Sequence, residues 1–150
     1  MSRYYLTNLI GNPLDTSIAI ASVIFGGVLQ RFPNLKFCFA HGGGFVPYQR
    51  GRLTRGFRVR EEARVCVSRP PDDYLRLVYF DTILHSEPAL KYLVSTFGAD
   101  RVMMGSDCPF DMSDPSSVDS VNGLRLGNRE TEMILHQNAI ELFRLDLKEL

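Results

Sequence analysis

The sequence predicts an α/β fold in which short apolar strands alternate with helices and pair into a parallel sheet. Three segments carry the strand pattern, residues 35–40, 77–81 and 102–105, because each is short and mostly apolar. Longer segments with helical patterns lie before, between and after them. Helices that connect successive strands in this way cover the faces of a parallel sheet.

The first half of the chain is predicted to contain two helices and two strands. A helix over residues 12–32 begins at Asn12, Asp15 or Thr16 as a cap, is apolar on most sides, and ends before Pro33. The buried strand 35–40 follows it, and then an arginine-rich helix over residues 45–64. Residues 68–73 are rich in proline and aspartate and predict a loop before the strand 77–81.

The second half is predicted from its start and stop signals. Ser86 caps a helix that has Pro88 in its first turn and ends at Phe97, just before Gly98. The strand 102–105 comes next, residues 108–121 form a loop or lid, and residues 129–142 form the last helix. Three strands make a small sheet with exposed edges, which indicates that the chain is part of something larger.

The length and composition predict one domain over residues 1–150, in a reducing cytoplasm. The 150 residues carry a formal net charge of zero, which argues against general attraction to nucleic acid or a membrane surface. The longest apolar run, residues 18–29, is short of the roughly 20 residues that span a bilayer. Three widely spaced cysteines, Cys38, Cys66 and Cys108, form neither a disulfide framework nor a zinc knuckle.

His41 ends the strand 35–40 and is followed by three glycines, which let the chain turn sharply. A polar side chain at the carboxyl end of a parallel strand faces the ligand crevice. The alternative is a buried histidine whose nitrogens bind backbone groups. The oxyanion-hole turn of lipases would need a downstream Gly-x-Ser-x-Gly motif, which this sequence lacks. A phosphate-binding loop would need Gly-x-Gly-x-x-Gly or a Walker-type Gly-Lys-Ser/Thr motif, and neither occurs.

Asp107 follows the strand 102–105, as His41 follows the strand 35–40. It is either the cap of a helix or turn, or a metal ligand or proton acceptor. Cys108 is a nucleophile beside His41 or, more simply, a small packing residue. Asp81 either bonds within the site or caps a turn. His85 is expected at a helix start and His136 within the last helix, both at the surface or in packing.

Seven arginines follow the glycine turn, and their default interpretation is a solvated helix face. Nucleic-acid binding is the second interpretation, but the neutral charge balance and the missing motifs argue against it. Arginine also binds carboxylates through two parallel hydrogen bonds. The seven residues are Arg50, Arg52, Arg55, Arg58, Arg60, Arg64 and Arg69.

In their order along the chain, several motifs resemble the amidohydrolase superfamily, and within it the branch of aminocarboxymuconate-semialdehyde decarboxylase. They are Arg31-Phe-Pro-Asn-Leu-Lys36, Ala40-His-Gly-Gly-Gly44, Gly51-Arg52, Met104-Gly-Ser-Asp-Cys-Pro-Phe110 and Asn138-Ala139. Residues 58–76 and 111–129 resemble the family less. Asp111-Met112 departs from the usual end of the aspartate motif, and Gln137 replaces a common glycine.

The resemblance implies the C-terminal part, about three strands, of a metal-dependent (β/α)₈ TIM barrel with zinc at its mouth. It implies that Asp107 is the metal ligand of the last strand and accepts a proton. It implies that His41 is the catalytic acid–base, and that Arg52 binds a substrate carboxylate, sometimes across a homodimer interface. The His-x-His pair and the middle-strand histidine of the family are absent from this sequence.

The predicted function is therefore that of a metal-dependent carboxy-lyase acting on a small unsaturated or aromatic carboxylate, inactive as this isolated chain. The alternatives are a hydrolase or hydratase on the same scaffold, or a non-catalytic remnant. Three expectations follow. His41 and Asp107 lie close together at one end of the sheet, the chain binds zinc weakly or not at all, and its exposed strand edges make it self-associate.

Overall fold

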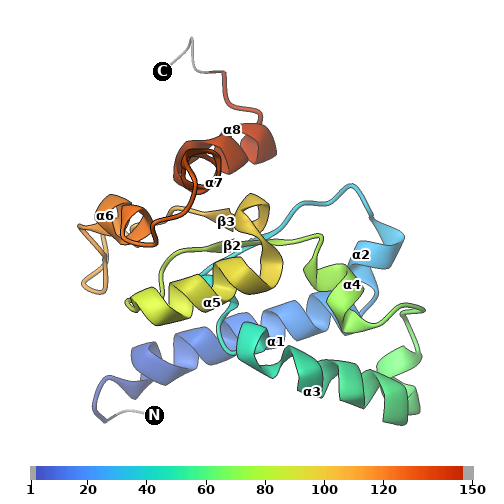
Figure 1. The fold of residues 1–150 in the computed structure, drawn as a ribbon. Coiled ribbons are helices and arrows are strands. Elements are labelled where there is room, and N and C mark those ends of the chain that lie inside the picture. Colours follow the sequence, from blue (N-terminus) through green and yellow to red (C-terminus); the bar gives the residue numbers. More distant parts are fainter. Residues whose placement is uncertain (1–2, 147–150) are drawn as a thin grey trace. The chain divides into compact units, whose positions relative to one another are not determined.

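The computed structural model describes residues 3–146, and helices dominate it. The elements in chain order are η1 (Thr7–Gly11), α1 (Asn12–Phe25), α2 (Val28–Arg31), β1 (Cys38–Phe39), η2 (His41–Gly43), α3 (Val46–Val59), η3 (Glu61–Arg64), α4 (Pro71–Leu75), β2 (Tyr79–Asp81), α5 (Glu87–Phe97), η4 (Ala99–Arg101), β3 (Val102–Met103), α6 (Ser117–Asn122), α7 (Asn128–Glu132), η5 (Met133–Gln137) and α8 (Asn138–Phe143). Here η1 and η5 are π-helical, and η2, η3 and η4 are 3₁₀ turns (Figure 1).

The chain divides into two compact units, unit 1 up to Val78 and unit 2 from Tyr79 onward. The expectation of a single domain over residues 1–150 stays a prediction. Among residues 3–146, none of the helices has the length and hydrophobicity needed to span a lipid bilayer.

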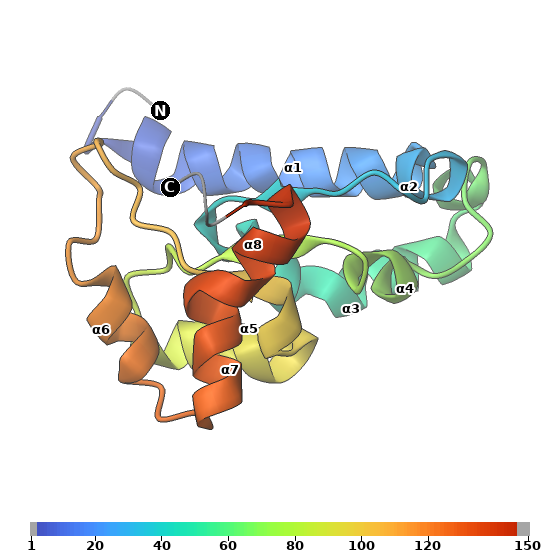
Figure 2. The same cartoon turned by 90° about the horizontal axis from the view of Figure 1, so that it is seen from above.

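The first predicted helix is present, but a glycine pair interrupts it. α1 ends at Phe25, Gly27 has a φ of +70°, and α2 then continues almost along the line of α1 (Figure 2). A Cβ at Gly27 would overlap with the backbone of Cys66, so the break gives this neighbouring segment room to approach. The predicted caps Asn12, Asp15 and Thr16 are wrong. The π-helical segment η1 runs directly into α1, and the N-cap residue of α1 is Gly11.

The strand predicted over residues 35–40 shortens to β1, Cys38–Phe39, and it is not buried. Phe37 and Phe39 are half-buried and stack with ring centroids 5.7 Å apart, whereas Lys36 and Cys38 are exposed. Side chains that alternate in this way belong to a strand covered on one face only. The prediction of a buried strand is therefore wrong.

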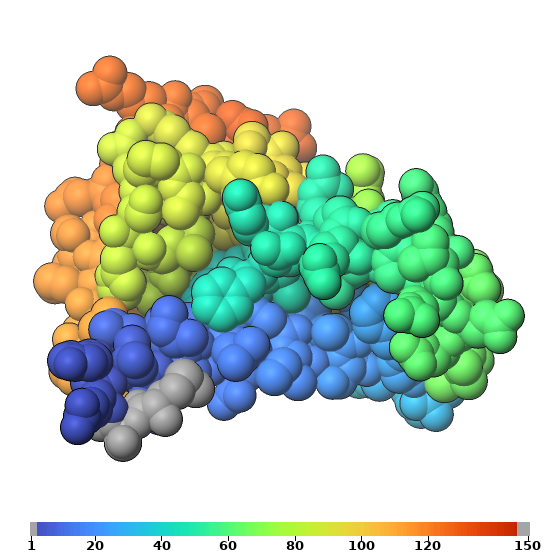
Figure 3. Space-filling view, turned by 90° about the horizontal axis from the view of Figure 1, so that it is seen from below, coloured from blue at the N-terminus to red at the C-terminus, as the bar shows by residue number. Residues whose placement is uncertain are grey.

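The arginine-rich helix is present as α3, which ends at Val59, and a 3₁₀ turn completes the predicted segment. It lies at the surface beside α1, as the teal and green atoms of Figure 3 show. The predicted loop 68–73 is wrong in its second half, where Pro71 starts α4. Proline is favoured at this first helical position because its missing N–H has no helical partner there.

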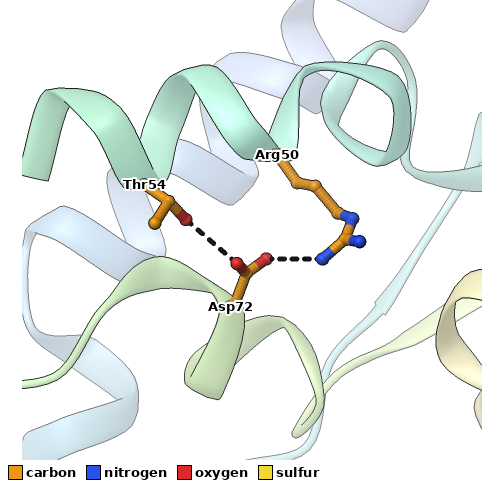
Figure 4. Close-up of polar contacts among 3 residues, drawn as sticks. All are labelled: Arg50, Thr54 and Asp72. Atoms are coloured by element: carbon orange, nitrogen blue, oxygen red, sulfur yellow. Dashed lines mark hydrogen bonds and ion pairs between the residues drawn. The ribbon is translucent and has the colours of Figure 1, made fainter.

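The Asp72 carboxylate fastens α4 to α3 through two hydrogen bonds (Figure 4). It accepts one from the Arg50 guanidinium and one from the Thr54 hydroxyl, both at 3.1 Å. The Arg69 guanidinium, just before α4, lies 4.9 Å from the centre of the Tyr74 ring. The two bonds of Asp72 connect α3 to α4 within unit 1.

Unit 2 contains two paired parallel strands, β2 and β3, with Phe80 opposite Val102 and Asp81 opposite Met103. They lie side by side in Figure 1, with α5 next to them. The predicted signals of α5 are confirmed: the Ser86 hydroxyl accepts from the Ala89 amide, and Gly98 follows the helix with a φ of +93°. The Phe80 and Phe97 rings pack with centroids 4.6 Å apart.

The predicted lid at residues 108–121 is partly wrong, because its end forms the short helix α6. The last predicted helix, residues 129–142, is confirmed as the continuous run of α7, η5 and α8, with the π-helical segment in its middle.

Both units contain fully buried large apolar side chains. The fully buried large side chains of unit 1 are Ile20, Ile24, Leu29, Tyr74, Leu75 and Val78. Those of unit 2 are Phe80, Leu93, Val102, Val121 and Ile134.

Candidate active site

The turn that begins at His41 is the most unusual stretch of backbone in unit 1. His41 and the three glycines after it all have positive φ angles, from +56° to +82°. Glycine adopts this conformation freely, but for histidine it costs of order 1 kcal/mol or more. Strained residues of this kind are concentrated at functional sites, which agrees with the prediction that His41 is functional.

Helix α1 holds this turn at both of its ends. The Thr16 hydroxyl and His41 Nδ1 are 2.9 Å apart, and the Ser17 hydroxyl accepts a hydrogen bond from the Phe45 amide at 2.7 Å. Ser17 also donates to the Pro13 carbonyl at 2.7 Å. A Cβ at Gly44 would overlap with Pro13 and crowd the Ser17 hydroxyl, so only glycine fits this close approach.

Asp107 also has a left-handed backbone, with a φ of +58°, and it is half-buried. The residues before it are anchored to the end of β2. The Thr82 hydroxyl accepts from the Gly105 amide at 3.1 Å and lies 3.3 Å from the Gly105 carbonyl, to which it can donate. The Cys108–Pro109 peptide bond is cis.

The loop after Asp107 closes on itself. The Phe110 amide donates to the Asp107 carbonyl at 3.0 Å, and the Asp114 amide donates to the Ser106 carbonyl at 2.8 Å. The Asp114 carboxylate accepts hydrogen bonds from the Ser116 amide, at 2.9 Å, and from the hydroxyls of Ser116 and Ser120, at 2.7 and 3.0 Å.

The hydrogen bond from the Ser116 hydroxyl is the main reason that the pKa of Asp114 lies below its ordinary value. Burial, the second-largest effect, raises this pKa, and the bonds from the Ser116 amide and the Ser120 hydroxyl and the charge of His85 each lower it by less. His85 and Asp114 line the same cavity, of about 140 Å³.

Arg52 lies on α3 with an exposed side chain, as do Arg55 and Arg58. The default interpretation of these arginines as a solvated helix face is therefore confirmed for this part of the helix. Arg50 differs because it is held by Asp72 (Figure 4). Arg52 is thus available to an anionic ligand in unit 1.

The structure places His41 and Arg52 in unit 1 and Asp107 in unit 2, so the closeness of His41 and Asp107 stays a prediction. Among residues 3–146 there is no group of three or more His, Cys, Asp or Glu side chains that could hold a metal ion. The described residues therefore do not by themselves fit the zinc site that the resemblance implies, because a catalytic zinc takes three protein ligands.

The structure also places the remaining candidates, which are Asp81, His85, His136 and Cys108. Asp81 caps a turn, since its carboxylate accepts from the Ile83 amide at 3.1 Å. His85 is exposed just before α5, and His136 is exposed in the last helix, as predicted. Cys108 is exposed, so its interpretation as a packing residue is wrong.

Sequence reasoning missed three polar residues that hold the candidate residues or their loops: Thr16 in unit 1, and Thr82 and Asp114 in unit 2. Thr16 was considered only as a helix cap, and its partner lies 25 residues away. Thr82 follows a strand end directly, which is a signal that could have been used. Asp114 begins an Asp-Pro-Ser-Ser segment, and aspartate next to serine is a common start of a helix.

A model of the family described as "Amidohydrolase" matches residues 9–145, nearly the whole chain. The chain belongs to the amidohydrolase family. Among curated relatives, it is 40% identical over 148 residues to 2-amino-3-carboxymuconate-6-semialdehyde decarboxylase from Dictyostelium discoideum. The match covers 97% of this chain and 41% of that protein.

Another relative catalyses a different reaction. The chain is 28% identical over 144 residues to 2-keto-4-carboxy-3-hexenedioate hydratase from Sphingobium sp., with 88% of this chain and 40% of that protein covered. The solved 5-carboxyvanillate decarboxylase from Novosphingobium aromaticivorans, complexed with manganese, superposes with a TM-score of 0.81 at 24% identity. That superposition covers 92% of this chain and 41% of the other, and it shows the fold alone. This amidohydrolase chain thus spans about two fifths of the length of these relatives.

Proposed function

We propose that this chain is the C-terminal part of a TIM-barrel decarboxylase of the amidohydrolase family, which acts on a small unsaturated or aromatic carboxylate. The 40% identity to a decarboxylase over 97% of the chain is the observation that carries the proposal. His41 and Asp107, which follow β1 and β3, support it, because both have the left-handed backbone that is concentrated at functional sites.

The chemistry that the proposal needs is a proton transfer. When a carboxylate leaves an unsaturated carbon as CO₂, the carbon–carbon bond breaks and a hydrogen takes the place of the carboxylate. A proton must therefore be delivered to that carbon. In this proposal His41 delivers it as a general acid, a role for which imidazole suits neutral pH.

Arg52 is proposed to bind the carboxylate of the substrate, since its guanidinium is exposed on α3 and Arg50 is occupied by Asp72. A bidentate pair with a carboxylate would fix the substrate's orientation as well as its charge. The proposed substrate is thus a small anion. A second copy of the protein is proposed as a partner, in a homodimer.

Asp107 is proposed as a ligand to a divalent metal, zinc by resemblance, once ligands from outside the described residues are present. The 5-carboxyvanillate decarboxylase is complexed with manganese, so the metal itself is tested by elemental analysis. We expect the 150-residue chain to bind less than one tightly held metal per molecule. A full equivalent that resists a chelator would contradict this expectation.

The test of the function is release of CO₂ by the protein encoded by the longest reading frame that contains this sequence. We expect release from an amino-carboxymuconate or hydroxybenzoate carboxylate, and a loss of about 10²–10⁴-fold in kcat for His41→Asn. His136→Asn is the matched control, because His136 is exposed in the last helix, and it should retain full activity. No CO₂ release from any of these carboxylates would refute the proposal.

A hydratase is the second candidate, and the likeness to the hydratase from Sphingobium favours it. In that reaction His41 would take a proton from water or give it to the product carbon. Loss of the substrate's double-bond absorbance without release of CO₂ would identify it. Absence of both activities would leave a non-catalytic remnant.

Within residues 3–146 the exposed cysteines Cys38, Cys66 and Cys108 form no disulfide, which supports a reducing compartment, and we propose the cytoplasm. Localisation of the tagged protein by fluorescence microscopy tests this proposal.

A further inference from the structure

The contact between Thr16 and His41 assigns different roles to the two nitrogens of the imidazole ring. Nδ1 lies 2.9 Å from the Thr16 hydroxyl, which belongs to α1. His41 is half-buried, and this contact engages Nδ1 and not the other nitrogen, Nε2. Nε2 is thus the ring nitrogen that the contact leaves for a ligand.

A hydroxyl group suits this position because it can both donate and accept a hydrogen bond. When His41 is neutral with its proton on Nδ1, Nδ1–H donates to the Thr16 oxygen and Nε2 keeps a lone pair that can take up a proton. When Nε2 has taken up that proton and the ring is cationic, Nδ1–H still donates to the Thr16 oxygen. The contact therefore persists through a cycle in which the ring gains and loses one proton at Nε2.

We propose that Thr16 is a positioning residue that engages Nδ1 of His41, so that Nε2 is the nitrogen through which His41 exchanges its proton with the substrate. This inference rests on the proposed function of His41 as an acid–base group.

The backbone around the contact is built to keep the ring in place. Thr16 is half-buried, and the neighbouring Ser17 holds the far end of the glycine turn through the Phe45 amide. Gly44 lies against Pro13 and Ser17 so closely that a side chain would not fit. The turn thus has little freedom relative to α1, and the hydrogen bond with Thr16 orients the ring on it.

The sharpest test is nitrogen NMR of the ring in the 150-residue chain. The chain has three histidines, so His85 and His136 serve as internal references in the same spectrum. We expect Thr16→Val, which keeps the shape but removes the hydroxyl, to move the Nδ1 resonance of His41 alone. Thr16→Ser should restore the wild-type position of this resonance.

The matched control is Ser22→Ala, because Ser22 is an exposed residue of the same helix and lies away from the turn. It should leave all three histidine spectra unchanged. An Nδ1 resonance of His41 that is the same in wild type and Thr16→Val would overturn the inference. If Thr16→Val does not fold, Thr16→Ala and Thr16→Ser provide the same comparison.

Kinetics of the longer protein separate positioning from a general structural role. Because misplacement by about 1 Å can cost roughly 10²-fold, we expect Thr16→Val to lower kcat by about 10–100-fold with KM within about twofold. Thr16→Ser should stay within about threefold of wild type in both constants. Equal kcat values for Thr16→Val and wild type would overturn the inference. If the longer protein is inactive, the proposed function fails, while the NMR result still decides whether Thr16 holds Nδ1.

Discussion

Asn138 is expected to be one of the most sensitive residues for the stability of unit 2. Its side chain is 4% exposed, and its amide nitrogen donates hydrogen bonds to the carbonyls of Ala99, at 2.7 Å, and Val102, at 2.8 Å. It therefore joins the last helix to the start of β3, the strand that leads to Asp107. The Met104 amide, which donates to the Ile134 carbonyl at 2.8 Å, reinforces the same junction.

The substitution Asn138→Ala removes the side-chain donor from two carbonyls in residues that are 7% and 0% exposed. The Ala99 carbonyl keeps the hydrogen bond from the Val102 amide, whereas the fully buried Val102 carbonyl loses its side-chain donor. A buried group left unsatisfied costs about 1–3 kcal/mol, and a lost hydrogen bond contributes about 1 kcal/mol. We therefore expect the free energy of unfolding to fall by about 2–4 kcal/mol. For a chain of this length the melting temperature should fall by roughly 4–16 °C.

The assay is urea unfolding followed by far-ultraviolet circular dichroism, with the slope compared between variants to confirm that the same surface unfolds. Gln137→Ala is the matched control: the neighbouring side chain is exposed and bonds only to Glu132, at 3.2 Å, so its loss should stay within about 0.5 kcal/mol. Asn138→Asp should cost more than alanine, because it places a carboxylate against two carbonyl oxygens. A loss below about 0.5 kcal/mol for Asn138→Ala would refute the reasoning.

Three further predictions concern other parts of the chain. The hydrogen bonds from Ser116 lower the pKa of Asp114, so its ionised form stabilises the fold above the ordinary aspartate value of 3.8, and this contribution is lost as the pH falls through the lower folded value. Urea midpoints measured between pH 7 and pH 2.5 should thus fall less on acidification in Asp114→Asn than in wild type, and equal slopes would contradict the assignment. Gly44→Ala should destabilise unit 1 by about 1–3 kcal/mol in thermal melts, because of its φ of +62° and its contact with Pro13, whereas Gly51→Ala, with open space around it, should be neutral or stabilising. Light scattering should show self-association, since Ile10, Ile18 and Leu35 are among the exposed apolar side chains, and a sharp monomer peak at modest concentration would contradict it.

The sequence alone determined those features that depend on neighbouring residues. The limits of α5 follow from Ser86, Pro88 and Gly98, and the positions of His41 and Asp107 follow from the apolar strands before them. Capping, proline geometry and the turn preference of glycine act within a few residues, so their signals are readable in a single sequence. Where the local signal was incomplete, as at the glycine pair after Phe25, the prediction of one helix over residues 12–32 was wrong.

Only the tertiary structure decided which polar groups work together. Thr16 and His41 are 25 residues apart in sequence, Asp72 and Thr54 are 18 apart, and Asn138 and Val102 are 36 apart. No local rule connects such residues, because the pairing depends on how helices pack and on where a turn brings the backbone. Thr16 had the pattern of a helix cap in the sequence, and it is a histidine partner because α1 lies against the glycine turn.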